Sequence, residues 1–381
     1  MRVIITNCIL ANRTGAELFV HDLAFSLKEK GHSIIAFAPI MGELAEELKT
    51  HSIECTTDLA SIHSSPDIII SNSYYETVAC LARFPDIPAI SVCHDSFALQ
   101  GQPPKFSRIF RYVAVDKNCH ERVQQELNFP ENEITIIQNG VDLARFQPRS
   151  PLPSKPLKAA IFSNYATDSA ETQAVQKACS DLNINLDIIG LGVNKISKHP
   201  EKILSNYDLV FAKARCAMEA IAVGCAVILL NEGVGFAGLV TSKNVKEWHP
   251  WNFGKRLFQQ PINVKNVSQA IKNYSAEDAA IVSNYIRAHA TLTIMTNSFE
   301  HLIQSLIDEA KTKRISSSQE NIEFSNFLIK HSRYQLGLAD EHLKLKLHVT
   351  EAKLKAILES TSWQITQPLR SLIIFLKRKF K

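Results

Sequence analysis

Short apolar runs alternate with helical patterns along most of this 381-residue chain, and this alternation limits its possible folds more than any other feature. The first run is Val3–Leu10. Residues 16–27 then place apolar side chains on one helical face, and Gly31 follows as a helix stop. Further apolar runs occur at 34–38, 67–71, 89–93, 111–115 and 134–137. Runs that are apolar on both faces, separated by helices, predict a parallel sheet covered on both sides.

The alternation of apolar runs and helical patterns is interrupted by a proline-rich segment and then begins again. Four prolines lie between residues 147 and 156, which indicates a stiff linker. Apolar runs at 159–163, 186–190, 209–212 and 226–230 follow, and residues 265–313 read as helices. We therefore predict a Rossmann-like domain over 1–148, a linker over 149–157 and a second Rossmann-like domain over 158–313. The two would face each other across a cleft.

The remaining residues have a different character. Residues 314–322 are polar and rich in serine, which predicts a hinge, and 323–381 read as a helical tail. An approximate heptad pattern is interrupted by Gly337, so a single packed helix and a coiled coil both remain open. Residues 363–381 combine an apolar face with five cations, which predicts contact with an anionic membrane surface. Docking on a partner or on the enzyme itself is the alternative. The heptad residues are Leu336, Leu343, Leu347, Leu354 and Ile357.

Composition narrows the class of protein. A formal net charge of +4 does not indicate a nucleic-acid partner. None of the eight cysteines forms a Cys-x-x-Cys pair, so a zinc site is not expected, and we predict reduced thiols in the cytoplasm. No apolar stretch approaches the roughly 20 residues of a spanning helix. Any membrane contact would be peripheral, on the inner face of the cytoplasmic membrane.

Ligands of open α/β sheets bind at the carboxyl ends of the strands, so the residues there are the first candidates. Thr14 and Gly15 follow the first run, where a glycine and a helix start could approach an anion. Thr14 and Glu17 are also spaced as a capping box, which needs no ligand. His94 and Asp95 follow another run and are the candidate catalytic residues. A histidine there could donate a hydrogen bond to a sugar hydroxyl, or could be an ordinary loop residue.

Two more segments carry polar residues beside predicted strands. Asn139-Gly140 is a turn signal, and Asp142 could cap a short helix, which is structure and not catalysis. Lys213 and Arg215 lie between a strand and a helix, where they could neutralise a diphosphate. Glu219 could accept hydrogen bonds from two vicinal hydroxyls. The alternative is an ordinary strand–turn–helix with a surface arginine.

These segments together resemble the family 4 retaining glycosyltransferases, which have the GT-B fold. The Ser-x-Ser-Trp-x-Ile-Thr-x-Pro-Leu-Arg string at 360–370 resembles the tails of bacterial surface-polysaccharide enzymes. The family 4 resemblance covers residues 1 to about 312. Its landmarks occur in the family's order. They are Gly-Ala-Glu at 15–17 with Lys-Gly-His at 30–32, His94-Asp95, Asn-Gly-Val-Asp…Arg-Phe…Pro at 139–148, and Glu-Ala-Ile-Ala-Val-Gly-Cys-Ala-Val at 219–227.

The resemblance implies roles for the matching residues. Gly15 would lie near the donor phosphates or the acceptor, and His94 near the donor sugar. Glu219 matches the second glutamate of the family's E-x7-E motif, which holds the donor ribose, and Lys213 and Arg215 would serve the diphosphate. The donor would be a UDP- or GDP-linked sugar, with no further cofactor. No metal is expected, since the chain has no Asp-x-Asp.

Two departures affect these expectations. The first glutamate of E-x7-E falls at Phe211, which is not acidic. The strand entering the second domain is followed by Asn164-Tyr165-Ala166, without the family's usual Gly-Arg and Lys-Gly pieces, and Asn164 is a donor-binding candidate only by its position. The sequence predicts a hexosyltransferase acting on a glycan or lipid-linked acceptor. The alternative is a catalytically silent GT-B protein that binds a nucleotide or glycan and recruits partners through its tail.

Overall fold

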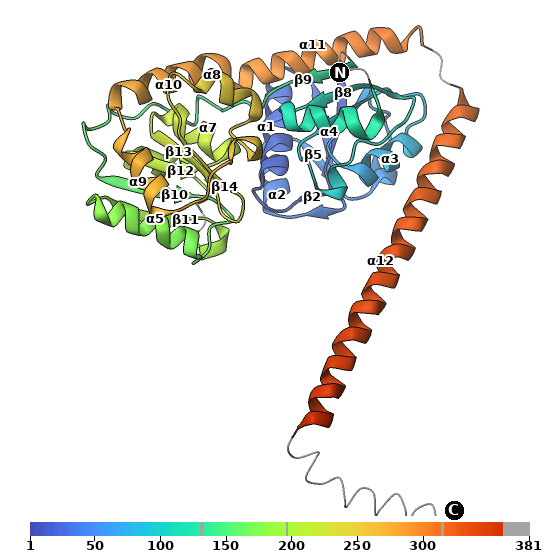
Figure 1. Ribbon diagram of the computed structural model, residues 1–381. Helices are drawn as coiled ribbons and strands as arrows, with labels where there is room; N and C mark the ends of the chain where they lie inside the picture. The colour runs from blue at the N-terminus through green and yellow to red at the C-terminus, as the bar shows by residue number, and fades with distance from the viewer. Residues whose placement is uncertain (130–132, 196, 314–315, 361–381) are drawn as a thin grey trace, which may run out of the picture. The chain divides into compact units, whose positions relative to one another are not determined.

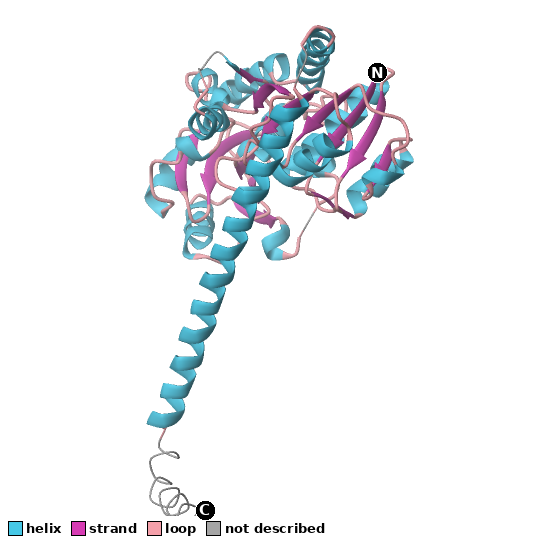
Figure 2. Ribbon diagram, turned by 90° about the vertical axis from the view of Figure 1, so that its right-hand side faces the viewer, coloured by secondary structure: helices cyan, strands magenta, loops and turns pink. Residues whose placement is uncertain are grey.

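A computed structural model describes residues 1–129, 133–195, 197–313 and 316–360. The chain forms two compact units, Met1–Ile315 and Ser316–Lys381. The first unit contains two parallel sheets, each with helices on both faces (Figures 1 and 2). The predicted fold class, two Rossmann-like halves followed by a helical extension, is confirmed.

The sheet of the N-terminal half has seven strands in the order β5-β3-β1-β6-β7-β8-β9, and all neighbours are parallel. Val3, Ile4 and Ile5 of β1 are buried, as expected for a strand with helices on both sides. A small parallel pair, β2 (Ile9–Leu10) with β4 (Ile40–Met41), lies beside it. The strands of the sheet are β1 (Arg2–Thr6), β3 (Ser33–Phe37), β5 (Glu54–Thr56), β6 (Ile68–Ser71), β7 (Ala89–Cys93), β8 (Ile109–Ala114) and β9 (Ile134–Ile136).

Four helices cover this sheet. Helices α1 and α4 carry the caps that their sequences predict. Asp116 Oδ1 accepts a hydrogen bond from the Cys119 backbone N–H at the start of α4, and Thr14 caps α1 in a complete capping box with Glu17. The helices are α1 (Gly15–Glu29), α2 (Glu43–Thr50), α3 (Tyr74–Arg83) and α4 (Lys117–Leu127).

The sheet of the C-terminal half has the order β11-β10-β12-β13-β14, of which only β14 is antiparallel. Alternate residues of its strands enter two separate hydrophobic clusters. Val210 and Ala212 face α7 and α10, whereas Leu209 and Phe211 face α5 and α9. The elements are β10 (Lys158–Phe162), β11 (Asn185–Ile189), β12 (Leu209–Ala212), β13 (Ala226–Asn231), β14 (Gly235–Leu239), α5 (Ala170–Asp181), α6 (Pro200–Ile203), α7 (Ala214–Val223), α8 (Val245–Trp248), α9 (Val264–Lys272) and α10 (Ala276–His289).

Helix α11 (Leu292–Ala310) leaves the C-terminal half and returns to the N-terminal half, where it packs on α1 (Figure 1). Phe299 contacts Phe19 with ring centroids 5.6 Å apart, and Arg111 pairs with Glu309 at 2.8 Å. The Asn139–Asp142 segment packs closely against the start of this helix. A Cβ on Gly140 would lie only 2.6 Å from Leu292 Cα. Asp142 Oδ1 accepts from the Ala144 and Arg145 N–H groups in a turn, not in the short helix predicted for it.

The second unit contains α12 (Ser317–Glu359), a helix of 43 residues. Residues 317–322, which the sequence analysis assigned to a hinge, form its first turns, since serine is favoured at helix starts and glutamine and glutamate favour helix. Leu336, Leu343 and Leu347 are exposed on it. Within the described residues, no helix is long and apolar enough to cross a bilayer. The predicted membrane contact at 363–381 falls outside the described residues.

Candidate functional site

The loops at the carboxyl ends of the two sheets meet. Lys255 Nζ lies 3.6 Å from the centroid of the Phe97 ring, and Lys117 Nζ lies 5.4 Å from that of Trp251. Gln138 Nε2 donates to the His249 carbonyl at 2.9 Å. These contacts join segments that follow β7, β8 and β9 to the 249–255 segment of the C-terminal half, whose Phe253 carbonyl accepts at 3.1 Å from the Ala214 N–H just after β12. The carboxyl ends of parallel strands, where α/β proteins bind ligands, therefore lie at the interface between the halves.

His94 is fixed at the end of β7 by a short chain of hydrogen bonds. Asn72 Nδ2 donates to the Thr6 carbonyl at 2.8 Å, which turns Asn72 Oδ1 toward His94 Nε2 at 2.7 Å. Nε2 must therefore carry the proton. Burial lowers the pKa of His94 to about 3, although nearby Asp95 opposes the shift. The ring is neutral at pH 7, and its Nδ1 can act as an acceptor.

Asp95 holds the turn that follows His94. Its Oδ1 accepts from the backbone N–H groups of Phe97 and Ala98, both at 2.5 Å. Arg122 lies 3.9 Å away from the same oxygen and donates to the Asp95 carbonyl at 2.7 Å. The side chain is exposed. This geometry gives Asp95 a structural role in shaping the loop opposite Lys213.

Lys213 is the N-cap of α7, and its Nζ lies 4.5 Å from the centroid of the Tyr165 ring. Burial lowers the pKa of its ammonium group, while Cys216 and Asp95 act in the opposite direction. The next residue, Ala214, has φ of 47° and donates its N–H to the Phe253 carbonyl at 3.1 Å. A non-glycine residue with positive φ costs about 1–3 kcal/mol and is found most often at functional sites. The backbone thus holds a partly desolvated cation at a helix N-terminus.

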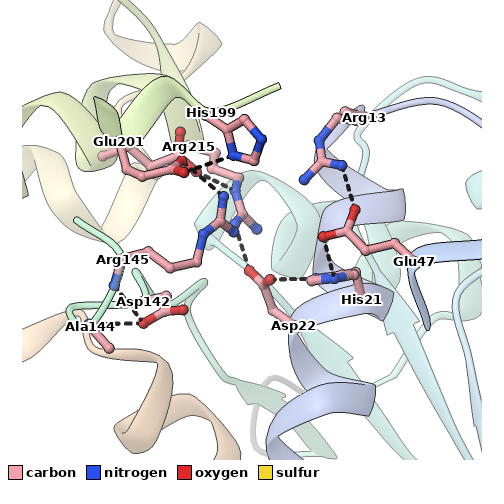
Figure 3. Close-up of polar contacts among 11 residues, drawn as sticks. Arg13, His21, Asp22, Glu47, Asp142, Ala144, Arg145, His199, Glu201 and Arg215 are labelled. Atoms are coloured by element: carbon pink, nitrogen blue, oxygen red, sulfur yellow. Dashed lines mark hydrogen bonds and ion pairs between the residues drawn. The ribbon is translucent and has the colours of Figure 1, made fainter. Parts of the chain in front are cut away.

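Arg215 and Glu219 lie beside Lys213 but bind protein groups. Arg215 Nε donates to Glu219 Oε1 at 2.7 Å, and Nη2 donates to Asp22 Oδ2 of α1 at 2.5 Å (Figure 3). Burial opposes ionisation of Asp22, but Arg215 and His21 outweigh it and lower the pKa of Asp22 to about 2. Burial raises the pKa of Glu219, and Arg215 partly offsets this. Arg215, for which the sequence predicts a role toward a diphosphate, joins the two halves through Asp22.

More charged residues extend this contact on both sides (Figure 3). His21 Nδ1 lies 3.0 Å from Asp22 Oδ1, and His21 Nε2 lies 3.4 Å from Glu47, which pairs with Arg13 at 2.6 Å. On the other side Arg145 pairs with Glu201 at 3.1 Å. Asp22 and His21 were not among the residues predicted from the sequence. The available signal was a polar pair, His21-Asp22, within the apolar pattern of residues 16–27.

The other predicted donor-binding residues lie in loops of both halves. Thr14 and Gly15 are exposed at the start of α1, and a Cβ on Gly15 would meet nothing within 4 Å among the described residues. Asn164 is exposed after β10, and its carbonyl accepts from Gly192 N–H at 3.1 Å. Glycine is needed at 192, since a Cβ there would lie 2.2 Å from the Ala166 carbonyl oxygen. Backbone packing therefore shapes the loop that holds Asn164 and Tyr165.

Phe211, at the position where the resemblance expects the first glutamate of E-x7-E, lies in the core. It is 0% exposed and packs on the α5 and α9 face of the sheet, whereas Glu219 lies on α7 at the opposite face. A carboxylate at 211 would therefore point away from α7.

Two Rossmann-like halves with facing carboxyl edges, joined by a last helix that returns to the first half, define the GT-B fold of glycosyltransferases. Residues 13–145 match the family model described as Glycosyltransferase Family 4. No curated protein sequence matches the chain.

Solved structures agree with this fold. A glycosyltransferase from Rickettsia africae aligns with a TM-score of 0.59 at 14% identity, covering 80% of this chain and 98% of its own. HepE from Anabaena, in complex with UDP and glucose, aligns with a TM-score of 0.58 at 13% identity, covering 80% and 100%. The lipopolysaccharide outer core galactosyltransferase WaaB, in its apo form, aligns with a TM-score of 0.53 at 10% identity, covering 80% and 99%.

Proposed function

We propose that this protein transfers a hexose from a UDP- or GDP-linked donor to a glycan or lipid-linked acceptor, with retention, in bacterial envelope polysaccharide synthesis. The proposal rests chiefly on Lys213, a partly buried cation at the N-terminus of α7 that faces the His94–Asp95 loop of the other half. A helix N-terminus and a desolvated cation both stabilise the charge that develops on a departing diphosphate.

We assign the remaining roles as follows. His94 Nδ1 would accept a hydrogen bond from a sugar hydroxyl, because Nε2 is committed to Asn72. Glu219 would hold the ribose once Arg215 releases it, since its side chain is buried and its Oε1 accepts from Arg215 Nε. Thr14, Gly15 and Asn164 would contact the donor from the surrounding loops. The acceptor hydroxyl would attack the anomeric carbon, the bond to the diphosphate would break, and the departing phosphate oxygen would take the proton.

The comparisons support parts of this proposal. The HepE structure contains UDP and glucose, and WaaB is described as a lipopolysaccharide galactosyltransferase. We extend both to this chain as a UDP-linked hexose donor and an envelope acceptor. We place the reaction in the cytoplasm, on the inner face of the cytoplasmic membrane, with residues 363–381 as a peripheral contact.

The test is a donor screen. The purified chain is mixed with UDP-glucose, UDP-galactose, UDP-N-acetylglucosamine and GDP-mannose, with and without a bacterial lipid extract, and released nucleotide is measured. We expect release from one donor, and a loss of about 100-fold or more in Lys213→Met, as for other groups that stabilise a developing charge. Lys177→Met is the matched control, because Lys177 lies on α5 and pairs with Asp181 on the surface. The absence of release under every condition would refute the proposal.

A second function is favoured by two observations. Phe211 is buried where an active family member would place a glutamate, and Arg215 and Glu219 bind each other. A catalytically silent protein that binds nucleotide or glycan and recruits partners through its tail would need neither glutamate. Tight UDP or GDP binding in calorimetry, combined with no release from any donor, would establish that alternative.

A further inference from the structure

Helices α1 and α3 of the N-terminal half begin with the same motif. Thr14 and Ser73 are their N-cap residues, and a glutamate follows three positions later, Glu17 in α1 and Glu76 in α3. This is the capping box, in which the hydroxyl binds the backbone N–H of the glutamate and the glutamate binds that of the N-cap residue. The same local sequence therefore predicts two identical helix starts.

The box of α1 is closed. Both reciprocal hydrogen bonds of Thr14 and Glu17 are present, with Glu17 Oε2 accepting from Thr14 N–H at 3.0 Å. Glu17 Oε1 also accepts from Ala11 and Asn12 N–H groups at 3.2 and 2.8 Å. All the acceptor capacity of this carboxylate is directed at the backbone, so it serves the fold.

The capping box of α3 is open, which means that its side-chain hydrogen bonds are not formed. Ser73 makes no side-chain cap bond, and neither Ser73 Oγ nor Glu76 Oε2 has a hydrogen-bond partner among the described residues. The two residues are only 4% and 9% exposed. Buried polar atoms in folded proteins are nearly always paired, and those that are not indicate a missing partner. Two such atoms on one helix turn point to a ligand.

The open box borders the candidate site. Asn72, which fixes His94, is the residue before Ser73. Burial and the Glu76 and Glu17 carboxylates raise the pKa of the Cys8 thiol, so Glu76 lies close to the loop that follows β1. Thr6 Oγ1 and Ser71 Oγ, at paired positions where β1 and β6 end, also have no partner in the described part of the chain. Hydroxyls and a carboxylate therefore gather at this edge of the sheet.

The chemistry of these groups selects the ligand. An unpaired carboxylate oxygen requires a hydrogen-bond donor and repels a phosphate. The positive end of α3 already compensates part of the Glu76 charge, so a cation is not needed. Serine and threonine hydroxyls can both donate and accept, which matches the hydroxyls of a sugar.

We propose that the open capping box of α3 binds a neutral sugar of the acceptor, with Glu76 Oε2 accepting from one of its hydroxyls and Ser73 Oγ bonding to the same sugar. This inference rests on the proposed function and names the acceptor side of that site. It makes Glu76 a binding residue, and no proton transfer is assigned to it.

The experiment uses the full chain, the donor found in the screen, and the methyl α-glycosides of glucose, galactose and mannose as acceptor probes. Transfer is followed by nucleotide release and by mass spectrometry of the product. At least one glycoside should be glycosylated, and Glu76→Gln and Ser73→Ala should each raise its KM at least tenfold.

Glu277→Gln is the matched control, since Glu277 lies in the first turn of α10 on the surface and its loss should leave KM unchanged. An unchanged KM in Glu76→Gln would overturn the proposal, as would a panel in which no glycoside reacts while the donor is hydrolysed.

Two further readouts do not require activity. Glu17→Gln opens a closed box and should lower Tm by several degrees, whereas Glu76→Gln should leave Tm unchanged or raise it, because it removes an unpaired buried charge. A large fall in Tm for Glu76→Gln would show a structural role and contradict the inference.

If no donor is turned over, the proposed function fails by itself. Saturation-transfer NMR with the three glycosides then decides: binding to the natural chain that is lost in Glu76→Gln supports the site, and equal or absent binding rejects it.

Discussion

Arg215 of α7 and Asp22 of α1 form a buried ion pair, 2.5 Å between Nη2 and Oδ2, that links the two halves of the GT-B fold. Arg215 also holds Glu219 on its own helix at 2.7 Å. One arginine thus compensates two buried carboxylates that come from different halves. The contact ties the position of α1 to the helix whose N-terminus carries Lys213, so its energy bears on both stability and access to the candidate site.

Replacing Arg215 with methionine should destabilise the chain strongly. The change leaves Asp22 and Glu219 buried without their cation, and breaking a buried pair in this way costs about 3–5 kcal/mol. Urea unfolding followed by circular dichroism measures the loss. Arg2→Gln is the control, because the Arg2–Glu54 pair is exposed and should contribute less than about 1 kcal/mol. Equal effects of the two changes would show that the buried pair is not coupled to folding.

The same pair predicts how stability depends on acid pH. The pKa of Asp22 falls from 3.8 to about 2 on folding, so ionised Asp22 stabilises the fold above about pH 4, and this contribution is lost as the pH falls through about 2. The shift corresponds to about 2 kcal/mol. We expect the difference in unfolding free energy between the natural chain and Asp22→Asn to narrow between pH 4 and pH 2. A difference that stays constant over this range would contradict the assigned pKa.

His94 should remain neutral, with its proton on Nε2, throughout the physiological range. Its pKa is lowered to about 3, so the folded chain resists protonation while the unfolded chain accepts a proton near pH 6.5. His94 therefore reduces stability progressively as the pH falls below about 6.5. Nitrogen-15 NMR of labelled histidine should show no titration of His94 between pH 5 and 8 in the folded chain, and titration near 6.5 in urea. Asn72→Ala should remove the preference for the Nε2–H tautomer, since Asn72 Oδ1 is its acceptor.

Restoring the family's first glutamate should not restore a donor contact. Phe211→Glu would bury an unpaired carboxylate in the core against α5 and α9, on the sheet face opposite α7. We expect loss of folding, visible as a lost cooperative transition in calorimetry, and no gain in nucleotide release. Phe211→Leu should fold and cost about 1–3 kcal/mol as a cavity-forming change. A folded and more active Phe211→Glu variant would show that β12 or its neighbours can reorient.

Local sequence patterns predicted most of the elements because their causes are local. Continuous apolar runs mark strands that are buried on both faces, and β1, β7, β10 and β12 lie where these runs occur. The capping box of α1 formed as its spacing indicates. The two-sheet fold followed from the repetition of one alternating pattern.

The site residues were harder to predict, since their roles depend on partners distant in sequence. Arg215 has the right spacing for a ligand-facing cation, yet its partner is Asp22, 193 residues away. Thr14–Glu17 and Ser73–Glu76 have the same motif but only the first is closed.

The sequence by itself determined which segments become strands and helices and which polar residues follow them, because hydrophobic periodicity and capping act within a few residues. The tertiary structure alone decided which of those polar groups bind each other, which stay unpaired and which sheet face Phe211 occupies. Those outcomes depend on how the two halves pack together, and a pattern within a few neighbouring residues does not specify that packing.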